Sequence, residues 1–248
     1  MRPTRLISRL DIKGDDVIKS INLEGLKKVG KPNELSKKYY EGGIDEILMI
    51  DTVATLYGRN NLQEIIKKAT ESIFVPITVG GGIRSLEDAE KMFKSGADKI
   101  AINSQVVKNP NFLKELKNIY GSQAIVVSME TKKINNHYEV YITNGRDRTN
   151  INLSDWIKKC QDFGAGEILL TSIDKEGTGK GLDLELLKLI QNIVEIPIIF
   201  SGGIGNMKHI VEALKFKNLD ALAIAKVLHY DQLNINEIKK IINENKNN

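Results

Sequence analysis

Two carboxyl side chains stand at the ends of apolar, strand-like runs, where they could transfer protons. Asp11 ends the first run, and Glu130 ends a later one. If both runs belong to one barrel, paired carboxyls at their ends suit a general acid and a general base. Solvated strand-end acids, or ion pairs with Lys13 or Lys132, are the alternative.

Two glycine clusters, residues 80–85 (GGGIRS) and 201–206 (SGGIGN), have the composition of phosphate-binding loops. Because glycine lacks a side chain, the backbone N–H groups of such a segment can approach an oxyanion closely. A tight turn without a ligand is the alternative for each cluster. Lys19 could supply charge to a bound phosphate or intermediate, although an exposed loop lysine is the simpler interpretation. The candidate phosphate-binding residues beside Lys19 are Gly82, Asn103, Ser104, Gly177, Gly203, Ala225 and Lys226.

These residues need a scaffold that brings distant segments together, and the sequence contains an internal repeat. Four pairs of residues each lie 121 positions apart: Gly43 and Gly164, Glu46 and Glu167, Pro76 and Pro197, and Gly82 and Gly203. A fixed offset indicates copies of one supersecondary unit. We therefore expect a single barrel domain over residues 1–248, built from half-barrels at approximately 1–122 and 123–248, with the glycine clusters on opposite sides of one mouth.

Strand-like and helix-like segments alternate eight times. The predicted strands are Leu6–Ile12, Ile47–Asp51, Ile77–Gly80, Lys99–Asn103, Ala124–Glu130, Glu167–Ser172, Ile198–Ser201 and Ala221–Ala225. The predicted helices are Asn33–Glu41, Leu62–Glu71, Leu86–Lys94, Pro110–Tyr120, Leu153–Phe163, Leu184–Ile193, Met207–Lys217 and Ile235–Asn245. This alternation predicts an α/β fold, a single (β/α)8 TIM barrel with parallel strands inside and helices outside.

Two connections are longer than a barrel requires. Residues 13–31 and 131–150 both follow predicted strands, at the end of the barrel where active sites lie. The second contains Tyr138–Ile142 between asparagine- and glycine-containing segments, which predicts a small hairpin. Both connections could serve as lids. Tolerated surface insertions are the alternative.

Charged residues precede several predicted strands at the opposite end of the barrel. They are Arg5, Glu46, Lys99 and Glu167. Arg5 shares side-chain parity with Asp11, and Lys99 shares it with Asn103, so the period of two points both inward. Inward charges cost desolvation free energy unless they are paired. One interpretation is a structural salt-bridge plug, and the other is a polar gate that admits a small molecule from beneath.

Composition argues against several other functions. The net charge of +4 is carried by lysines spread over predicted helix faces, which favours a solvated surface over nucleic-acid binding. Cys160 is the only cysteine and the three histidines lack metal-ligand spacing, so we expect no disulfide, no metal and no cofactor. The sequence contains no apolar signal region and no membrane-length segment, so we expect no membrane partner and a cytoplasmic location.

The chain resembles the cyclase subunit of imidazole glycerol phosphate synthase across nearly its whole length. The resemblance rests on residues 10–11 (LD), Asp51, 79–83 (VGGGI), 97–99 (ADK), 102–103 (IN), 121–124 (GSQA), 164–174 (GAGEILLTSID), 177–178 (GT) and 201–203 (SGG). It implies a (β/α)8 barrel that forms a heterodimer with a glutaminase (HisH-like) subunit at the bottom of the barrel and receives ammonia through it.

The resemblance also implies a reaction and residue roles. The substrate would be a small, ribulose-containing bisphosphate, PRFAR, and the products imidazole glycerol phosphate and AICAR, in histidine biosynthesis. The family's strand-one aspartate is catalytic and matches Asp11. The family's ammonia gate matches Arg5, Glu46, Lys99 and Glu167, which favours the gate over the plug.

Several positions depart from the family's pattern. Glu130 stands where the family has its second catalytic aspartate, so the carboxyl moves by about 1 Å, which can cost on the order of 100-fold in rate. Arg9 replaces a cysteine and could lock Glu130 in an ion pair, while Glu176 replaces an aspartate and Lys226 a serine. Two alternatives follow. One is a divergent paralogue that uses channelled ammonia to amidate a surface-glycan sugar, and the other is a non-catalytic partner that activates a glutaminase.

Overall fold

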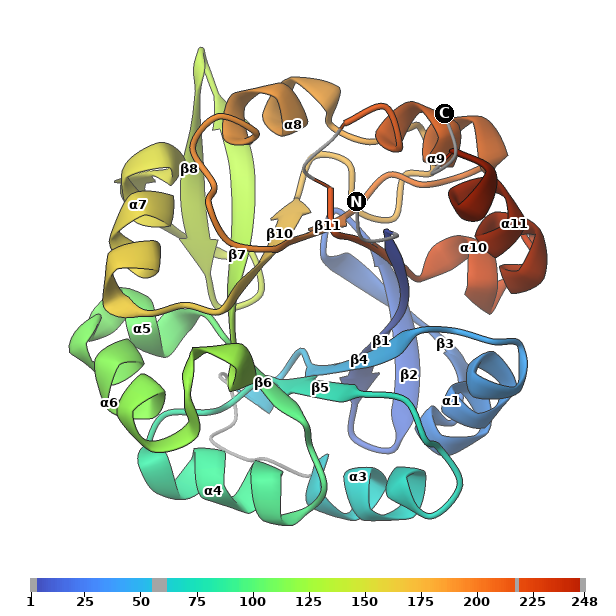
Figure 1. Ribbon diagram of the computed structural model, residues 1–248, viewed down its shortest axis with the longest axis horizontal. Helices are drawn as coiled ribbons and strands as arrows, with labels where there is room; N and C mark the ends of the chain where they lie inside the picture. The colour runs from blue at the N-terminus through green and yellow to red at the C-terminus, as the bar shows by residue number, and fades with distance from the viewer. Residues whose placement is uncertain (1–3, 55–61, 217–218, 246–248) are drawn as a thin grey trace.

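Eight parallel strands form a closed barrel in the computed structural model, which describes residues 4–54, 62–216 and 219–245 (Figure 1). The strands are β1 (Arg5–Lys13), β4 (Glu46–Asp51), β5 (Ile77–Gly80), β6 (Lys99–Ile102), β7 (Ile125–Ile134), β10 (Glu167–Ser172), β11 (Ile198–Ser201) and β12 (Ala221–Ile224). The barrel closes because β1 pairs with both β4 and β12, and β7 pairs with both β6 and β10. The predicted (β/α)8 barrel is confirmed.

Helices surround the strands (Figure 1). They are α1 (Pro32–Glu41), α3 (Leu62–Thr70), α4 (Leu86–Lys94), α6 (Asn111–Tyr120), α7 (Leu153–Phe163), α8 (Leu184–Ile190), α9 (Met207–Ala213) and α11 (Ile235–Asn245). The short helices α5 (Ser104–Lys108), η1 (Ser122–Ala124) and α10 (Lys226–His229) were not predicted. Helices α8 and α9 end earlier than predicted, and the predicted end of the latter, Lys217, lies outside the described residues.

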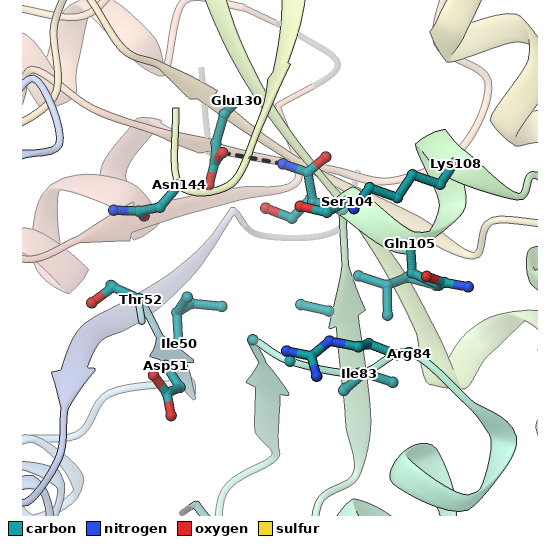
Figure 2. A pocket seen from close by; sticks show the side chains of 16 residues that line it. Ile50, Asp51, Thr52, Ile83, Arg84, Ser104, Gln105, Lys108, Glu130 and Asn144 are labelled. Carbon is teal, nitrogen blue, oxygen red and sulfur yellow. Dashed lines mark hydrogen bonds between the residues drawn. The ribbon is translucent and has the colours of Figure 1, made fainter. Parts of the chain in front are cut away.

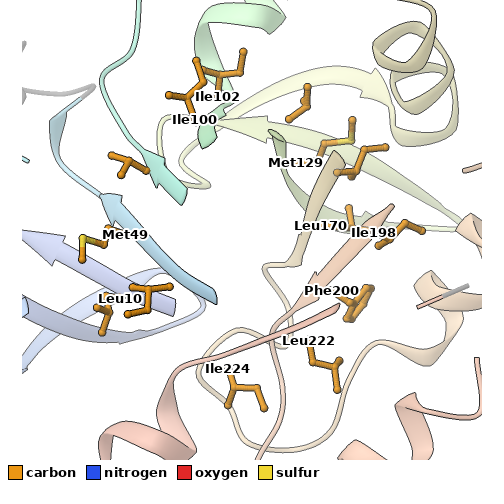
Figure 3. Packing of buried hydrophobic residues seen from close by; sticks show 14 of the residues in the cluster. Leu10, Met49, Ile100, Ile102, Met129, Leu170, Ile198, Phe200, Leu222 and Ile224 are labelled. Carbon is orange, nitrogen blue, oxygen red and sulfur yellow. The ribbon is translucent and has the colours of Figure 1, made fainter. Parts of the chain in front are cut away.

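Strand residues alternate between two apolar layers, as the period of two requires. One set points outward to the helices and includes Leu10, Met49 and Phe200 (Figure 3). The other set fills the inside of the barrel, and its members are Ile7, Leu48, Ala101, Val126, Leu169, Ile199, Ala221 and Ala223. We call this second set the interior cluster. The same alternation turns Arg9 and Asp11 inward, two and four positions past the inward Ile7 along β1.

Two antiparallel excursions leave the carboxyl ends of the strands. Strands β2 (Asp16–Ile21) and β3 (Glu24–Gly30) form a hairpin after β1, where the sequence predicted only a long connection. The predicted hairpin after β7 is confirmed in β8 (His137–Ile142), and β9 (Asp147–Asn152) adds a third strand.

The turn between β2 and β3 anchors the first excursion. Asn22 and Leu23 adopt left-handed φ values of 51° and 63°, and Leu23 is buried against Tyr141 and Ile173. The Asn22 N–H donates to the Glu176 carbonyl at 2.8 Å. The β2–β3 hairpin is therefore held against the segments that follow β7 and β10, across the mouth of the barrel.

Candidate active site

Asp11 lies at the centre of the mouth, buried, beside the guanidinium of Arg9. Arg9 Nε donates to Asp11 Oδ1 at 2.9 Å, and Lys19 Nζ lies 3.9 Å from Asp11 Oδ2. Burial alone would raise the pKa of Asp11, but the charges of Arg9 and Lys19 hold it below its usual value. The ion pairs considered from the sequence, with Lys13 or Lys132, do not form, because both lysines are exposed.

Lys19 is buried, so the simpler interpretation of an exposed loop lysine is wrong. The β2–β3 hairpin carries its side chain into the mouth, where Nζ forms an ion pair with the carboxylate of Glu176. Glu176 is itself 3% exposed. This pair places a cation between two carboxylates, those of Glu176 and Asp11.

Glu130 faces the mouth from β7 and contacts neutral donors. Its Oε2 accepts from Asn103 Nδ2 at 3.1 Å and from the Gly145 N–H at 2.8 Å. Burial, opposed by the charge of Arg9 and by these hydrogen bonds, raises the pKa of Glu130 to about 7. Arg9 pairs with Asp11, so the ion pair that would have locked Glu130 is not present. A carboxyl with this pKa can both donate and accept a proton near neutral pH.

One pocket opens between the ends of β5 and β6, and we call it the β5–β6 pocket (Figure 2). It contains the predicted Gly82, Asn103 and Ser104 together with Glu130. Gly81 has a φ of 99°, and a Cβ there would lie 2.3 Å from the Asp51 carbonyl oxygen, so only glycine fits. Sequence reasoning missed further lining residues, which are Arg84, Gln105, Lys108 and Asn144. Figure 2 shows Glu130 and Arg84 on opposite sides of this pocket.

A second pocket lies between the ends of β11 and β12, and we call it the β11–β12 pocket. It brings together the predicted Gly177, Gly203, Ala225 and Lys226. Gly177 and Gly203 have φ values of 72° and 97°, and a Cβ on either would meet a carbonyl oxygen at 2.0 Å. Lys226 Nζ reaches across to the Thr178 carbonyl oxygen at 3.4 Å. Close backbone approach with a neighbouring cation suits an anionic group.

Four charged side chains close the opposite end of the barrel, and we call them the charged ring. Arg5 Nη1 lies 2.6 Å from Glu46, and its Nη2 pairs with Glu167. Lys99 Nζ lies 3.1 Å from Glu46 and 2.9 Å from Glu167. Each carboxylate therefore meets two cations, and the predicted inward orientation is confirmed. The interior cluster lies between the charged ring and Asp11.

The remaining candidates for metal or nucleophilic chemistry are dispersed. Cys160 is buried in α7, and burial raises the pKa of its thiol to about 12. His229 is buried with its Nδ1 2.6 Å from the Tyr39 hydroxyl, and burial lowers its pKa to about 4. Within residues 4–54, 62–216 and 219–245, no three His, Cys, Asp or Glu side chains are arranged to hold a metal ion. No described helix is long and apolar enough to cross a bilayer.

Comparisons with known proteins show similarity along most of the chain. A family model described as "Histidine biosynthesis protein" matches residues 5–234. The "Imidazole glycerol phosphate synthase subunit HisF" of Legionella pneumophila is 53% identical over 209 residues, which cover 84% of this chain and 99% of that protein. Proteins of the same name from Streptococcus mutans serotype c and Methanococcus maripaludis are 40% and 42% identical. These matches cover 98% and 99% of this chain, and 98% of each relative.

Proposed function

Because this chain belongs to the family of histidine biosynthesis proteins, we propose that it is the ammonia-dependent cyclase subunit of an imidazole glycerol phosphate synthase. As an enzyme of histidine biosynthesis it converts PRFAR and ammonia to imidazole glycerol phosphate and AICAR. The observation that carries the proposal is the pair of glycine-lined pockets at the mouth, with Asp11 and Glu130 buried at the same end of the barrel. A substrate with a phosphate at each end spans the two pockets and exposes its middle to these carboxyls.

The β5–β6 pocket offers the first phosphate Gly82, Asn103 and Ser104, and the β11–β12 pocket offers the second Gly177, Gly203, Ala225 and Lys226. Ammonia adds to a carbonyl carbon through its lone pair, and the oxygen must take up protons before it leaves as water. A carboxyl that holds a proton near neutral pH can supply one and take another from the added nitrogen. The contacts and pKa of Glu130 suit that role.

The charged ring and the surface around it support a partner at the bottom of the barrel. Relatives are named as subunits of a synthase, which implies a partner subunit for this chain as well. Phe74, in the connection before β5, is 77% exposed, and Ile119, near the end of α6, is 56% exposed. Exposed large apolar side chains near one end of a barrel favour a protein contact there. We propose a HisH-like glutaminase that docks on this face and delivers ammonia through the charged ring and the interior cluster.

A divergent paralogue that amidates a surface-glycan sugar is the second candidate. One observation favours it: Arg9 occupies the centre of the mouth and pairs with Asp11, where the family resemblance implies an uncharged cysteine. The same pockets would then bind a different anionic acceptor, while ammonia would still enter through the charged ring.

Turnover of PRFAR tests the choice directly. Purified protein is given PRFAR and ammonium salt at alkaline pH, and loss of substrate absorbance is followed, with Asp11→Asn as the inactive control. Turnover that Asp11→Asn abolishes supports the cyclase. No turnover by wild type or by Glu130→Asp, together with stimulation of a bound glutaminase, contradicts it and leaves the glycan paralogue or the non-catalytic activator.

A further inference from the structure

Arg9 is buried at the mouth, and the proposed reaction assigns it no role. Its side chain points inward from β1 and is 2% exposed. We propose that Arg9 is a positioning residue that fixes Asp11 as a permanent anion and leaves proton transfer at the mouth to Glu130. The division of labour between the two carboxyls rests on the proposed cyclase function, while the effect of Arg9 on Asp11 does not.

The guanidinium of Arg9 is fixed by three strands. Its Nε donates to Asp11 on β1 itself, and its Nη1 donates to Thr171 on β10 at 2.9 Å and to Ser201 on β11 at 3.2 Å. Both hydroxyl-bearing residues are buried. A planar guanidinium with these three contacts cannot rotate towards β7 without breaking them. Arg9 therefore forms its ion pair with Asp11, and it acts on Glu130 through its charge alone, without a direct contact.

The basic groups that face Asp11 come from three elements. Arg9 approaches from β1, Lys19 from β2 and the buried His229 from α10. Glu130 also faces Asp11, from β7, and its own contacts are neutral donors, while Glu176 is paired with Lys19. Protonation of Asp11 would leave the buried guanidinium of Arg9 without its anion, which is unfavourable in a dry environment. Asp11 can accept a hydrogen bond or orient ammonia, but it holds no proton to donate.

Glu130 has the opposite surroundings. Its hydrogen-bond partners are an amide side chain and a backbone N–H, and the charged groups that face it are Arg9 and Asp11, which neutralise each other. Among the described residues no cation lies within ion-pair distance of its carboxyl. Burial without a cation favours the protonated form. Of the two carboxyls, Glu130 is thus the one that can exchange a proton near neutral pH.

Carboxyl titration of the intact protein tests the division of roles without any substrate. The chain is labelled with 13C in its aspartate and glutamate carboxyls, and the Asp11→Asn and Glu130→Gln variants identify the two signals by their loss. In the wild type we expect the Glu130 signal to titrate near pH 7, while the Asp11 signal titrates below the range that is usual for an aspartate. Arg9→Gln should raise the titration midpoint of Asp11 by at least about one pH unit, and Arg9→Lys should restore most of the difference.

The pH dependence of turnover provides a second readout, with the glutaminase complex and PRFAR. Arg9→Gln should lower kcat on the order of tenfold and add a second ionisation to the pH profile, with KM nearly unchanged. A purely structural role would lower kcat equally at all pH values. Titration of Asp11 together with Glu130 near neutrality in the wild type overturns the proposal, as does an unmoved Asp11 midpoint in Arg9→Gln. If that variant does not fold, the wild-type and Arg9→Lys titrations still decide. Absence of PRFAR turnover would contradict the cyclase function and leave the titration result intact.

Discussion

The two ends of the barrel both carry buried charge, but they balance it differently. In the charged ring, Glu46 and Glu167 face two cations, Arg5 and Lys99, and each carboxylate contacts both. In the cluster around Arg9 at the mouth, three buried carboxyls meet two cations. They are Asp11, Glu130 and Glu176, with Arg9 and Lys19.

The difference shows how one fold makes a charged group either inert or reactive. Where charges are equal in number, every carboxylate finds a cation and the ring is closed. Where one carboxyl is in surplus, the one without a cation keeps a proton at a higher pH, and in the cluster around Arg9 this is Glu130. A lone carboxyl with a raised pKa is what proton transfer requires.

The largest effect we expect comes from removing the surplus carboxyl. Glu130→Gln keeps the shape of the side chain and removes the exchangeable proton, so turnover of PRFAR should fall about 10²- to 10⁴-fold. The loss should be the same with ammonium salt and with glutamine plus the partner, because both routes end at the mouth. Steady-state assays with each nitrogen source measure it. A loss seen only with glutamine would place Glu130 in ammonia delivery instead.

The same variant should also make the free energy of unfolding depend less on pH. The folded-state pKa of Glu130 is raised to about 7. At higher pH the wild type is therefore destabilised by a carboxyl that ionises more readily in the unfolded chain, and the neutral glutamine has no such effect. Glu130→Gln should therefore exceed the wild type at pH 8 by up to about 3 kcal/mol, and by less than about 1 kcal/mol at pH 5. Urea unfolding at the two pH values provides the comparison. A pH-independent difference would mean that Glu130 is ionised in both states.

Breaking the charged ring should lower turnover with glutamine but not turnover with ammonium salt. Lys99→Met leaves Glu46 and Glu167 with Arg5 alone, so the ring should open or distort. Glutamine-dependent turnover should fall on the order of tenfold, which corresponds to about 1.4 kcal/mol of coupling, while turnover with ammonium salt stays near wild type. The ratio of the two rates is the measurement. Equal losses with both nitrogen sources would assign the ring a structural role only.

The smallest effect concerns charge at the rim of the mouth. Lys108 is exposed and lines the β5–β6 pocket, so Lys108→Gln should weaken binding of inorganic phosphate by about threefold, as expected for a partly solvated charge contact. Lys99→Met, which removes the same charge at the other end, should leave phosphate affinity unchanged. Calorimetric titration of both variants decides. Equal weakening would mean that phosphate responds to net charge and not to the pocket.

Regular elements could be predicted from the sequence because their signals are local. Strands β5, β10 and β11 begin and end where predicted, since each is a β-branched run bounded by polar or glycine residues. The side chains of Ser85 and Asn206 cap α4 and α9, and a serine or asparagine directly before a helix is a local signal as well. Hairpin β2–β3 was missed because its sequence lacks an apolar alternation and its turn is fixed by distant contacts of Leu23.

The candidate site could be predicted in part for the same reason. Glycine clusters and strand-end acids are visible in short segments, and the inward direction of Arg5 and Lys99 follows from parity. The burial of Lys19 depends on Glu176, which is 157 positions away, and no local pattern contains it. Lys108 was missed because α5 was not predicted, so nothing indicated that its side chain lines a pocket.

The barrel is closed by the pairing of its first strand, β1, with its last strand, β12, and this matters for the newly synthesised chain. Strand β1 pairs with β4 on one side, but its other neighbour is β12, with Arg5 opposite Ala221 and Ser8 opposite Ile224. At typical translation rates the last strand follows the first by roughly ten to forty seconds. During that time β1 presents an open strand edge, which is a site for aggregation between chains. The charges of Arg5, Arg9 and Asp11 on this strand disfavour such pairing, because charged side chains at a strand edge oppose association between chains.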